Sequence, residues 1–279
     1  MPNPSFQGLR VLTLESRRAA EIGTLVRTFG GEPVSAPALR EVPGDDRPAV
    51  AFAAAVGRGE FDVVVLMTGV GVRALLAAVD RAGSRDAFVA GLARVHIAAR
   101  GPKPIAVLRE LGLAPWVAAP EPNTWRELLI ALDAAGGVNG RRVAVQEYGR
   151  SNPDLLEALR ARGASVTSVP VFQYALPDDV EPLERAVDAL IAGTIDVVLL
   201  TTGTQALHVF QVADQMERRD DLRRAFARVV VASIGPSTSE ALIELGLSAD
   251  LEPSYPKMGI LVREAAERAA ALRAAKRLT

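Results

Sequence analysis

The stretch FDVVVLMTG at residues 61–69 decides the fold, because it recurs as IDVVLLTTG at residues 195–203. The offset is 134 residues, from Thr68 to Thr202 (202 − 68). The same offset relates Gly101-Pro102 to Gly235-Pro236, and Leu111-Gly112-Leu113 to Leu245-Gly246-Leu247. Separate anchors at one offset indicate an internal repeat. We therefore expect two homologous halves.

Short apolar runs predict strands that are buried on both faces. They lie at residues 10–14, 61–67, 95–98, 142–146, 195–200 and 229–234. Segments with helical spacing lie between them, at residues 20–29, 72–79, 105–111, 155–161, 183–191 and 239–245. This alternation predicts the α/β class, with two similar parallel-sheet domains that carry helices on both faces.

Two equivalent segments, residues 32–43 and 165–177, are proline-containing and longer than the usual strand of about five or six residues. We expect each to be a strand that runs on into an interdomain connector, and the two to pair. Domain one would then hold residues 1–38 and 176–279, and domain two residues 42–169, with connectors at 39–41 and 170–175. Tandem halves divided near Asn139 are the alternative.

Composition narrows the function classes. The 279 residues carry a net charge of −1, no cysteine and two histidines. We therefore expect no nucleic-acid partner and no disulfide, thiolate zinc site or other metal site. The N-terminus lacks the pattern of a signal peptide, and the apolar runs fall far short of the about 20 residues that cross a bilayer. We expect a cytoplasmic protein without a membrane partner.

Small and polar residues follow the predicted strands and precede helices, which is where open parallel sheets bind ligands. Free helix N-terminal N–H groups there suit carboxylates or phosphates. The simpler alternative is that Ser237 or Thr238 only caps a helix and that the glycines only close turns. The candidate binding residues are Arg17, Thr68, Gly69, Gly71, Arg100, Gly101, Lys103, Gly149, Thr202, Gly203, Thr204, Gly235, Pro236, Ser237 and Thr238.

These motifs, in this order, resemble the uroporphyrinogen-III synthase family over nearly the whole chain. The family's strand and following helix correspond to Met67-Thr68 and to residues 71–75, GVRAL. Its late Ile-Gly-Pro-x-Thr turn corresponds to residues 234–238, and its connector motif to residues 169–172, VPVF. Phe172 and Pro104 depart from the family, which has tyrosine and commonly threonine there, and the family's Thr-Arg-Pro after the first strand is absent. Arg17 and Arg18 are candidates to supply that charge.

The resemblance implies an enzyme that converts hydroxymethylbilane, a linear tetrapyrrole, to uroporphyrinogen III without a cofactor. The last pyrrole ring is inverted through a spiro intermediate and water is released. We expect a monomer that holds the substrate in a cleft between its domains, with Tyr174 and Tyr148 as candidate proton donors. The alternatives are a non-enzymatic binding protein for an anionic small molecule and a regulatory protein derived from the same fold.

Overall fold

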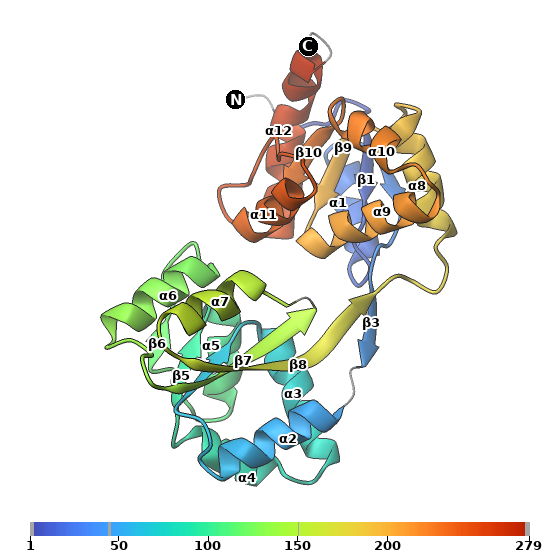
Figure 1. Ribbon diagram of the computed structural model, residues 1–279. Helices are drawn as coiled ribbons and strands as arrows, with labels where there is room; N and C mark the ends of the chain where they lie inside the picture. Colours follow the sequence, from blue (N-terminus) through green and yellow to red (C-terminus); the bar gives the residue numbers. More distant parts are fainter. Residues whose placement is uncertain (1–2, 44–45, 150, 277–279) are drawn as a thin grey trace. The chain divides into compact units, whose positions relative to one another are not determined.

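The computed structural model describes residues 3–43, 46–149 and 151–276. The chain divides into two compact units. Unit 1 comprises Met1–Arg40 and Ala175–Thr279, and unit 2 comprises Glu41–Tyr174. Each unit is a sheet with helices on both faces (Figure 1).

The sheet of unit 1 has the order β10-β9-β1-β2, and every pair in it is parallel. Alternate residues of β9 face opposite sides, as the pleat requires. Val197 and Leu199 pack in the core that includes α1 and α12, whereas Val198 and Leu200 pack in the core that includes the other helices. The elements are β1 (Arg10–Thr13), α1 (Ala19–Thr28), β2 (Glu32–Ser35), α8 (Glu181–Ile191), β9 (Val197–Leu200), α9 (Gly203–Gln215), α10 (Arg219–Phe226), β10 (Val230–Ser233), α11 (Pro236–Glu244) and α12 (Met258–Lys276).

The sheet of unit 2 has the order β3-β8-β7-β4-β5-β6, and the pairs from β8 to β6 are parallel. Val63 and Val65 of β4 pack against α6 and α7, whereas Val64 and Leu66 pack against α2, α3, α4 and α5. The elements are β3 (Arg40–Pro43), α2 (Asp46–Gly57), β4 (Val63–Leu66), α3 (Gly69–Arg81), α4 (Arg85–Leu92), β5 (His96–Ala99), α5 (Pro102–Glu110), β6 (Val117–Ala118), α6 (Trp125–Ala134), β7 (Arg142–Gly149), α7 (Pro153–Ala161) and β8 (Ser165–Ala175).

The repeat extends to the bounds of the elements. Both ends of β9, α9, α10, β10 and α11 lie 134 residues beyond those of β4, α3, α4, β5 and α5, for example 203 − 69 and 215 − 81 for α9 and α3. The predicted internal repeat is therefore present in the structure.

The aspartate of the repeated stretch has the same structural role in both units. Asp62 Oδ2 accepts a hydrogen bond of 2.8 Å from the backbone N–H of Arg142, at the start of β7. Asp196 Oδ2 accepts one of 2.8 Å from the backbone N–H of Arg10, at the start of β1. In each unit, the aspartate of one sequence repeat therefore anchors a strand of the other repeat. The anchored strands pair with the strands that follow the aspartates, β7 with β4 and β1 with β9.

One expectation about the connectors is wrong. Residues 32–43 form two strands, because β2 ends at Ser35 and β3 begins at Arg40. Pro37 lies between them, and hydrogen bonds to the strand-β1 side continue around it, from the Ala36 N–H to the Thr13 carbonyl at 3.0 Å and from the Ala38 N–H to the Leu14 carbonyl at 3.1 Å. The second segment is continuous, since β8 runs for 11 residues and lies between β3 and β7 in the sheet of unit 2.

Candidate functional site

The candidate binding residues gather at the carboxyl edge of the sheet within each unit. In unit 2, Thr68 follows β4, Arg100 follows β5 and Gly149 ends β7. In unit 1, Arg17 follows β1, Thr202 follows β9 and Gly235 follows β10. Parallel strands end at the same edge, so each unit presents several helix N-termini there.

The first turn of α3 is built by Thr68 and two glycines. The Thr68 side chain caps the helix, and its Oγ1 accepts a hydrogen bond of 3.0 Å from the Gly71 N–H. A Cβ on Gly69 would lie 2.8 Å from the carbonyl oxygen of Lys103, in α5. Gly69 therefore lets α3 and α5 approach closely at the carboxyl edge, which is a packing role and not the closing of a tight turn.

Gln146 completes this part of the edge and was missed in the sequence. It is the β7 residue opposite Leu66, it is fully buried, and its Nε2 donates to the Glu147 carbonyl at 2.8 Å. Its Oε1 has no hydrogen-bond partner among the described residues. A Cβ on Gly71 would lie 2.2 Å from Gln146 Nε2, so Gly71 makes room for this amide. The signal was a polar residue directly after the apolar run VAV of residues 143–145.

Arg100 is the cation best suited to an anion at this edge. Its backbone N–H donates to the Leu66 carbonyl at 3.0 Å, which continues the β4–β5 ladder by one residue. Burial lowers the pKa of the Arg100 guanidinium, because desolvation disfavours its charged form. Within the described part of the chain, no carboxylate pairs with Arg100. Lys103, by contrast, is exposed at the start of α5.

Gly149 and Tyr174 meet at the end of β7. Gly149 has a φ of +78°, and a Cβ there would lie 2.5 Å from the Tyr174 ring. Tyr174 is half-buried on β8. Tyr148 belongs to β7, but its side chain lies outside the described part of the structure. The structure thus brings together one candidate proton donor and one candidate binding residue.

The carboxyl edge of unit 1 repeats the close helix approach. A Cβ on Gly203 would lie 2.5 Å from the Ala241 Cβ, so Gly203 allows α9 and α11 to touch as Gly69 does for α3 and α5. Thr202 caps α9 and Thr204 lies in its first turn, whereas Gly101 and Gly235 cap α5 and α11.

The simpler account of Ser237 and Thr238 is wrong. Neither residue caps α11, because Gly235 is the cap and Pro236 is the first helical residue. Thr238 is buried and Ser237 is exposed. The hydroxyl of Ser237 therefore does not cap α11.

Two carboxylates at these edges were also missed in the sequence. In unit 1, Glu15 Oε2 accepts from Thr201 Oγ1 at 2.5 Å, and Thr201 Oγ1 accepts from Gln205 Nε2 at 2.9 Å. In unit 2, the buried Glu147 accepts from Ser151 Oγ at 2.8 Å and from the Asn152 N–H at 3.0 Å, and also bonds Ser168. In the sequence, the signal for both residues was an acidic side chain directly after a predicted buried strand. Both acids hold neighbouring strand ends in place.

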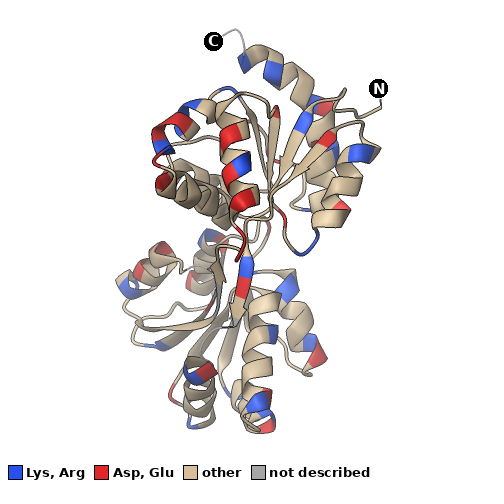
Figure 2. Ribbon diagram, turned by 90° about the vertical axis from the view of Figure 1, so that its right-hand side faces the viewer, with Lys and Arg blue, Asp and Glu red and all other residues tan. Residues whose placement is uncertain are grey.

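Most other charges are used in surface ion pairs. Acidic and basic residues alternate along the outer helices, while the strands are largely free of them (Figure 2). Arg18, which was a candidate beside Arg17, pairs with Glu21, and this bond raises the pKa of Arg18. Arg17 itself is exposed. In the described ranges, no cluster of histidine and acidic residues could hold a metal ion, and none of the helices combines the length and apolar character that a bilayer crossing requires.

Comparisons with known proteins agree with this architecture. Residues 20–263 match the model of the family described as uroporphyrinogen-III synthase HemD. A protein of Bacillus subtilis strain 168, YjjA, is uncharacterised and is 30% identical over 93% of this chain and 96% of its own length. A protein of Methanothermobacter thermautotrophicus, provisionally named a uroporphyrinogen-III synthase, is 30% identical over 88% of this chain and 92% of its own.

Solved structures of uroporphyrinogen III synthases have a similar fold. A mutant uroporphyrinogen III synthase of the extremely thermophilic bacterium Thermus thermophilus aligns with a TM-score of 0.73 and 26% identity, over 95% of this chain and 99% of the other. The wild-type enzyme in another crystal form aligns with a TM-score of 0.60 and 29% identity, over 95% and 98% of the two chains.

Proposed function

The chain belongs to the uroporphyrinogen-III synthase family, and from this we propose that it converts hydroxymethylbilane to uroporphyrinogen III. The family and the fold support an enzyme of the cyclising lyase type. The proposed reaction closes the linear tetrapyrrole, inverts its last ring through a spiro intermediate and releases one water molecule. The substrate is the only proposed partner, and the proposal includes no cofactor.

The observation that carries the proposal is Arg100, a half-buried cation at a ligand-binding edge that no described carboxylate neutralises. Each ring of the substrate carries acetate and propionate groups. A guanidinium binds a carboxylate through two parallel charge-assisted hydrogen bonds. We assign Arg100 to one of these carboxylates, with Arg17 and Lys103 as exposed partners that contribute less.

Helix N-termini supply the neutral donors. The helices α3, α5, α9 and α11 begin at the carboxyl edges, after Thr68, Gly101, Thr202 and Gly235. Their first N–H groups suit carboxylates, as do the hydroxyls of Thr204, Ser237 and Thr238. Several such contacts to one flexible chain of rings would favour the conformation in which its two ends react, which is catalysis by orientation.

Loss of the substrate hydroxyl as water requires a proton. We propose that Tyr174 donates it, because its phenol is on a strand that neighbours the carboxyl end of β7 and its ring is held against Gly149. A positioned general acid contributes about 10²–10⁴-fold to a rate. Tyr148 is the second candidate.

The decisive experiment incubates the protein with freshly prepared hydroxymethylbilane and separates the uroporphyrinogen isomers after oxidation to porphyrins. The III isomer should dominate. The I isomer, which forms spontaneously, is the product of a buffer control. If the protein yields only the I isomer while calorimetry shows that it binds uroporphyrinogen III, the proposal fails and the chain is a binding protein for anionic tetrapyrroles.

A further inference from the structure

A cavity of about 470 Å³ lies at the amino edge of the sheet in unit 2. Its polar walls come from residues at or just before the starts of β4, β5 and β7, namely Asp62, Arg94, His96, Arg141 and Arg142. Strands of four residues place this edge roughly 10 Å from the carboxyl edge of the same sheet. The cavity is therefore separate from the site proposed above, and its volume is within the usual range for small-molecule sites.

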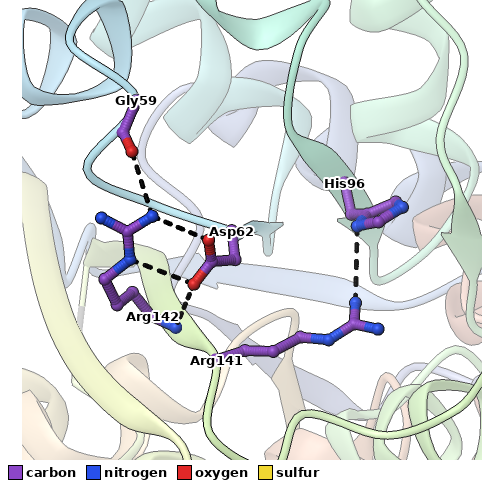
Figure 3. Close-up of polar contacts among 5 residues, drawn as sticks. All are labelled: Gly59, Asp62, His96, Arg141 and Arg142. Atoms are coloured by element: carbon purple, nitrogen blue, oxygen red, sulfur yellow. Dashed lines mark hydrogen bonds and ion pairs between the residues drawn. The ribbon is translucent and has the colours of Figure 1, made fainter.

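Arg142 and Asp62 form the fixed wall of the cavity (Figure 3). Arg142 Nη2 lies 2.7 Å from Asp62 Oδ1, and Nε lies 3.1 Å from Oδ2. Arg142 Nη2 also donates to the Gly59 carbonyl at 3.0 Å. This pair is held from two sides, and its charges cancel.

Arg141 and Arg94 are the cations of the cavity that form no ion pair with a described carboxylate, although the charge of Asp62 acts on Arg141 through space. Arg141 Nη1 lies 3.4 Å from His96 Nδ1, and its guanidinium lies 5.1 Å from the centre of the Trp116 ring. Arg94 Nη2 donates to the Gly57 carbonyl at 3.0 Å. Among the described residues, no carboxylate pairs with either guanidinium, and both retain free N–H donors.

The contact between Arg141 and His96 suits one tautomer of the histidine. A guanidinium has only donors, so the matching tautomer accepts at Nδ1 and has its N–H at Nε2. Nε2–H is then a further donor on the same strand edge. Figure 3 shows His96 and Arg141 facing each other on one side, and the Asp62–Arg142 pair on the other.

The fold itself does not require these side chains. The anchoring by Asp62 recurs in unit 1 at Asp196, but the position equivalent to His96 is Val230 (230 − 96 = 134). The residue before Arg10, equivalent to Arg141 before Arg142, is Leu9. Of the donors that line the cavity, His96 and Arg141 are therefore specific to unit 2, whereas Arg94 has an equivalent in Arg228 (228 − 94 = 134).

From this cavity we infer a second binding site, for a small phosphate-bearing anion. Asp62 balances the charge of Arg142, so Arg94 and Arg141 leave the lining with two net positive charges, which match the two charges of a phosphate. Arginine forks bind phosphate oxygens through paired hydrogen bonds. His96 adds a ring N–H donor, and Val56, Phe61 and Val95 add an apolar wall. Occupation of this site leaves the carboxyl edge free.

The test is calorimetry on the full chain at low salt, with inorganic phosphate, inorganic pyrophosphate and glycerol 3-phosphate as probes. At least one should bind saturably, and comparison of the free anions with the ester shows which source of phosphate the site takes. Arg141→Gln and Arg94→Gln should each weaken binding at least about tenfold, since each removes a charge-assisted bond. Arg94 is exposed, so its variant remains informative if Arg141→Gln fails to fold.

Arg160→Gln is the matched control, because it removes the same charge from the exposed face of α7 in the same unit. It should change the affinity less than about twofold, because Arg160 does not line the cavity and its exposed charge is paired with Glu157 and screened by salt. The inference is overturned if none of the three probes binds, if Arg160→Gln weakens binding as much as Arg141→Gln does, or if citrate binds more tightly than every phosphate.

Discussion

The ring of Tyr174 packs against the α-carbon of Gly149, so closely that a Cβ on this glycine would lie 2.5 Å from two ring carbons. The two residues lie on the neighbouring strands β7 and β8, where Gly149 is opposite Gln173. The backbone φ of Gly149 is +78°, a value that residues other than glycine rarely adopt. Glycine is thus required here by its conformation and by the ring.

Gly149→Ala should lower the free energy of unfolding by more than the roughly 1 kcal/mol that a positive φ alone costs. Gly83→Ala is the control, because Gly83 has a φ of +67° and no atom within 4 Å of an added Cβ. Urea denaturation of both variants separates the contact from the conformation. Equal losses would show that the ring moves aside freely.

Gly71→Ala should also destabilise the protein, although alanine normally favours a helix. The new Cβ would lie 2.2 Å from Gln146 Nε2 and 2.9 Å from Thr68 Oγ1, so both the fully buried amide and the helix cap would have to shift. Gly23→Ala in α1 is the control, since its nearest contact is an ordinary 3.6 Å. It should be neutral or stabilising by up to about 1 kcal/mol. In thermal unfolding, the melting temperature should fall for Gly71→Ala and should stay the same or rise for Gly23→Ala.

The sequence was sufficient for the class of the fold, because buried parallel strands leave unbroken apolar runs. The run VVVL of β4 and the run VVLL of β9 gave the strands and the repeat together. Several helices fall outside the predicted segments. The alanine-rich α2 and the short α4 lack a clear apolar stripe joined to a start signal, whereas α6 has the capping box of Thr124 and Glu127 before a leucine stripe and was overlooked. The break between β2 and β3 was also missed, because a proline in an extended segment is compatible with an edge strand as well as with a strand end.

The carboxyl-edge residues could be predicted from the sequence, because topology alone puts strand ends together. Their individual roles could not. That Gly69 accommodates the Lys103 carbonyl, or that Gly71 accommodates Gln146, depends on which helices touch in three dimensions. His96 lies within the predicted strand at residues 95–98, and only the pairing of β4, β5 and β7 places it near Arg141.

Asp62→Asn should make part of the stability independent of pH. The bonds from the Arg142 guanidinium, and then from its backbone N–H, lower the pKa of Asp62 from 3.8 to about 2. A lowered carboxyl pKa stabilises the fold above the unfolded value and loses this contribution as the pH falls from 3.8 towards 2. The side chains are 39% and 49% exposed, so solvent screening limits the effect to about 1 kcal/mol or less.

The measurement is urea denaturation from neutral pH down into this window. The difference in unfolding free energy between the wild type and the Asp62→Asn variant should be greatest at neutral pH and should shrink on acidification. A difference that stays constant across the window would mean that the carboxylate charge of Asp62 contributes nothing, and that only its hydrogen-bond geometry matters.

Tyr174→Phe removes the proposed proton donor and keeps the ring that packs against Gly149. We expect a fall in kcat of at least about tenfold, KM within about twofold and an unchanged melting temperature. Tyr174→Ala is the comparison, and it should also reduce stability. A Tyr174→Phe variant with the full rate of uroporphyrinogen III formation would leave Tyr174 with a packing role only.

Arg100→Gln should separate stability from function. A half-buried cation without an acid costs free energy, as the lowered pKa of Arg100 indicates, so the neutral variant should be as stable as the wild type or more stable by about 1 kcal/mol. Its affinity for uroporphyrinogen III, measured by calorimetry, should nevertheless fall about tenfold through loss of a charge-assisted pair. Arg109→Gln, on the exposed face of α5, should change neither quantity. A variant that binds normally but unfolds more easily would assign Arg100 to the structure and would remove the main support for carboxylate binding at this edge.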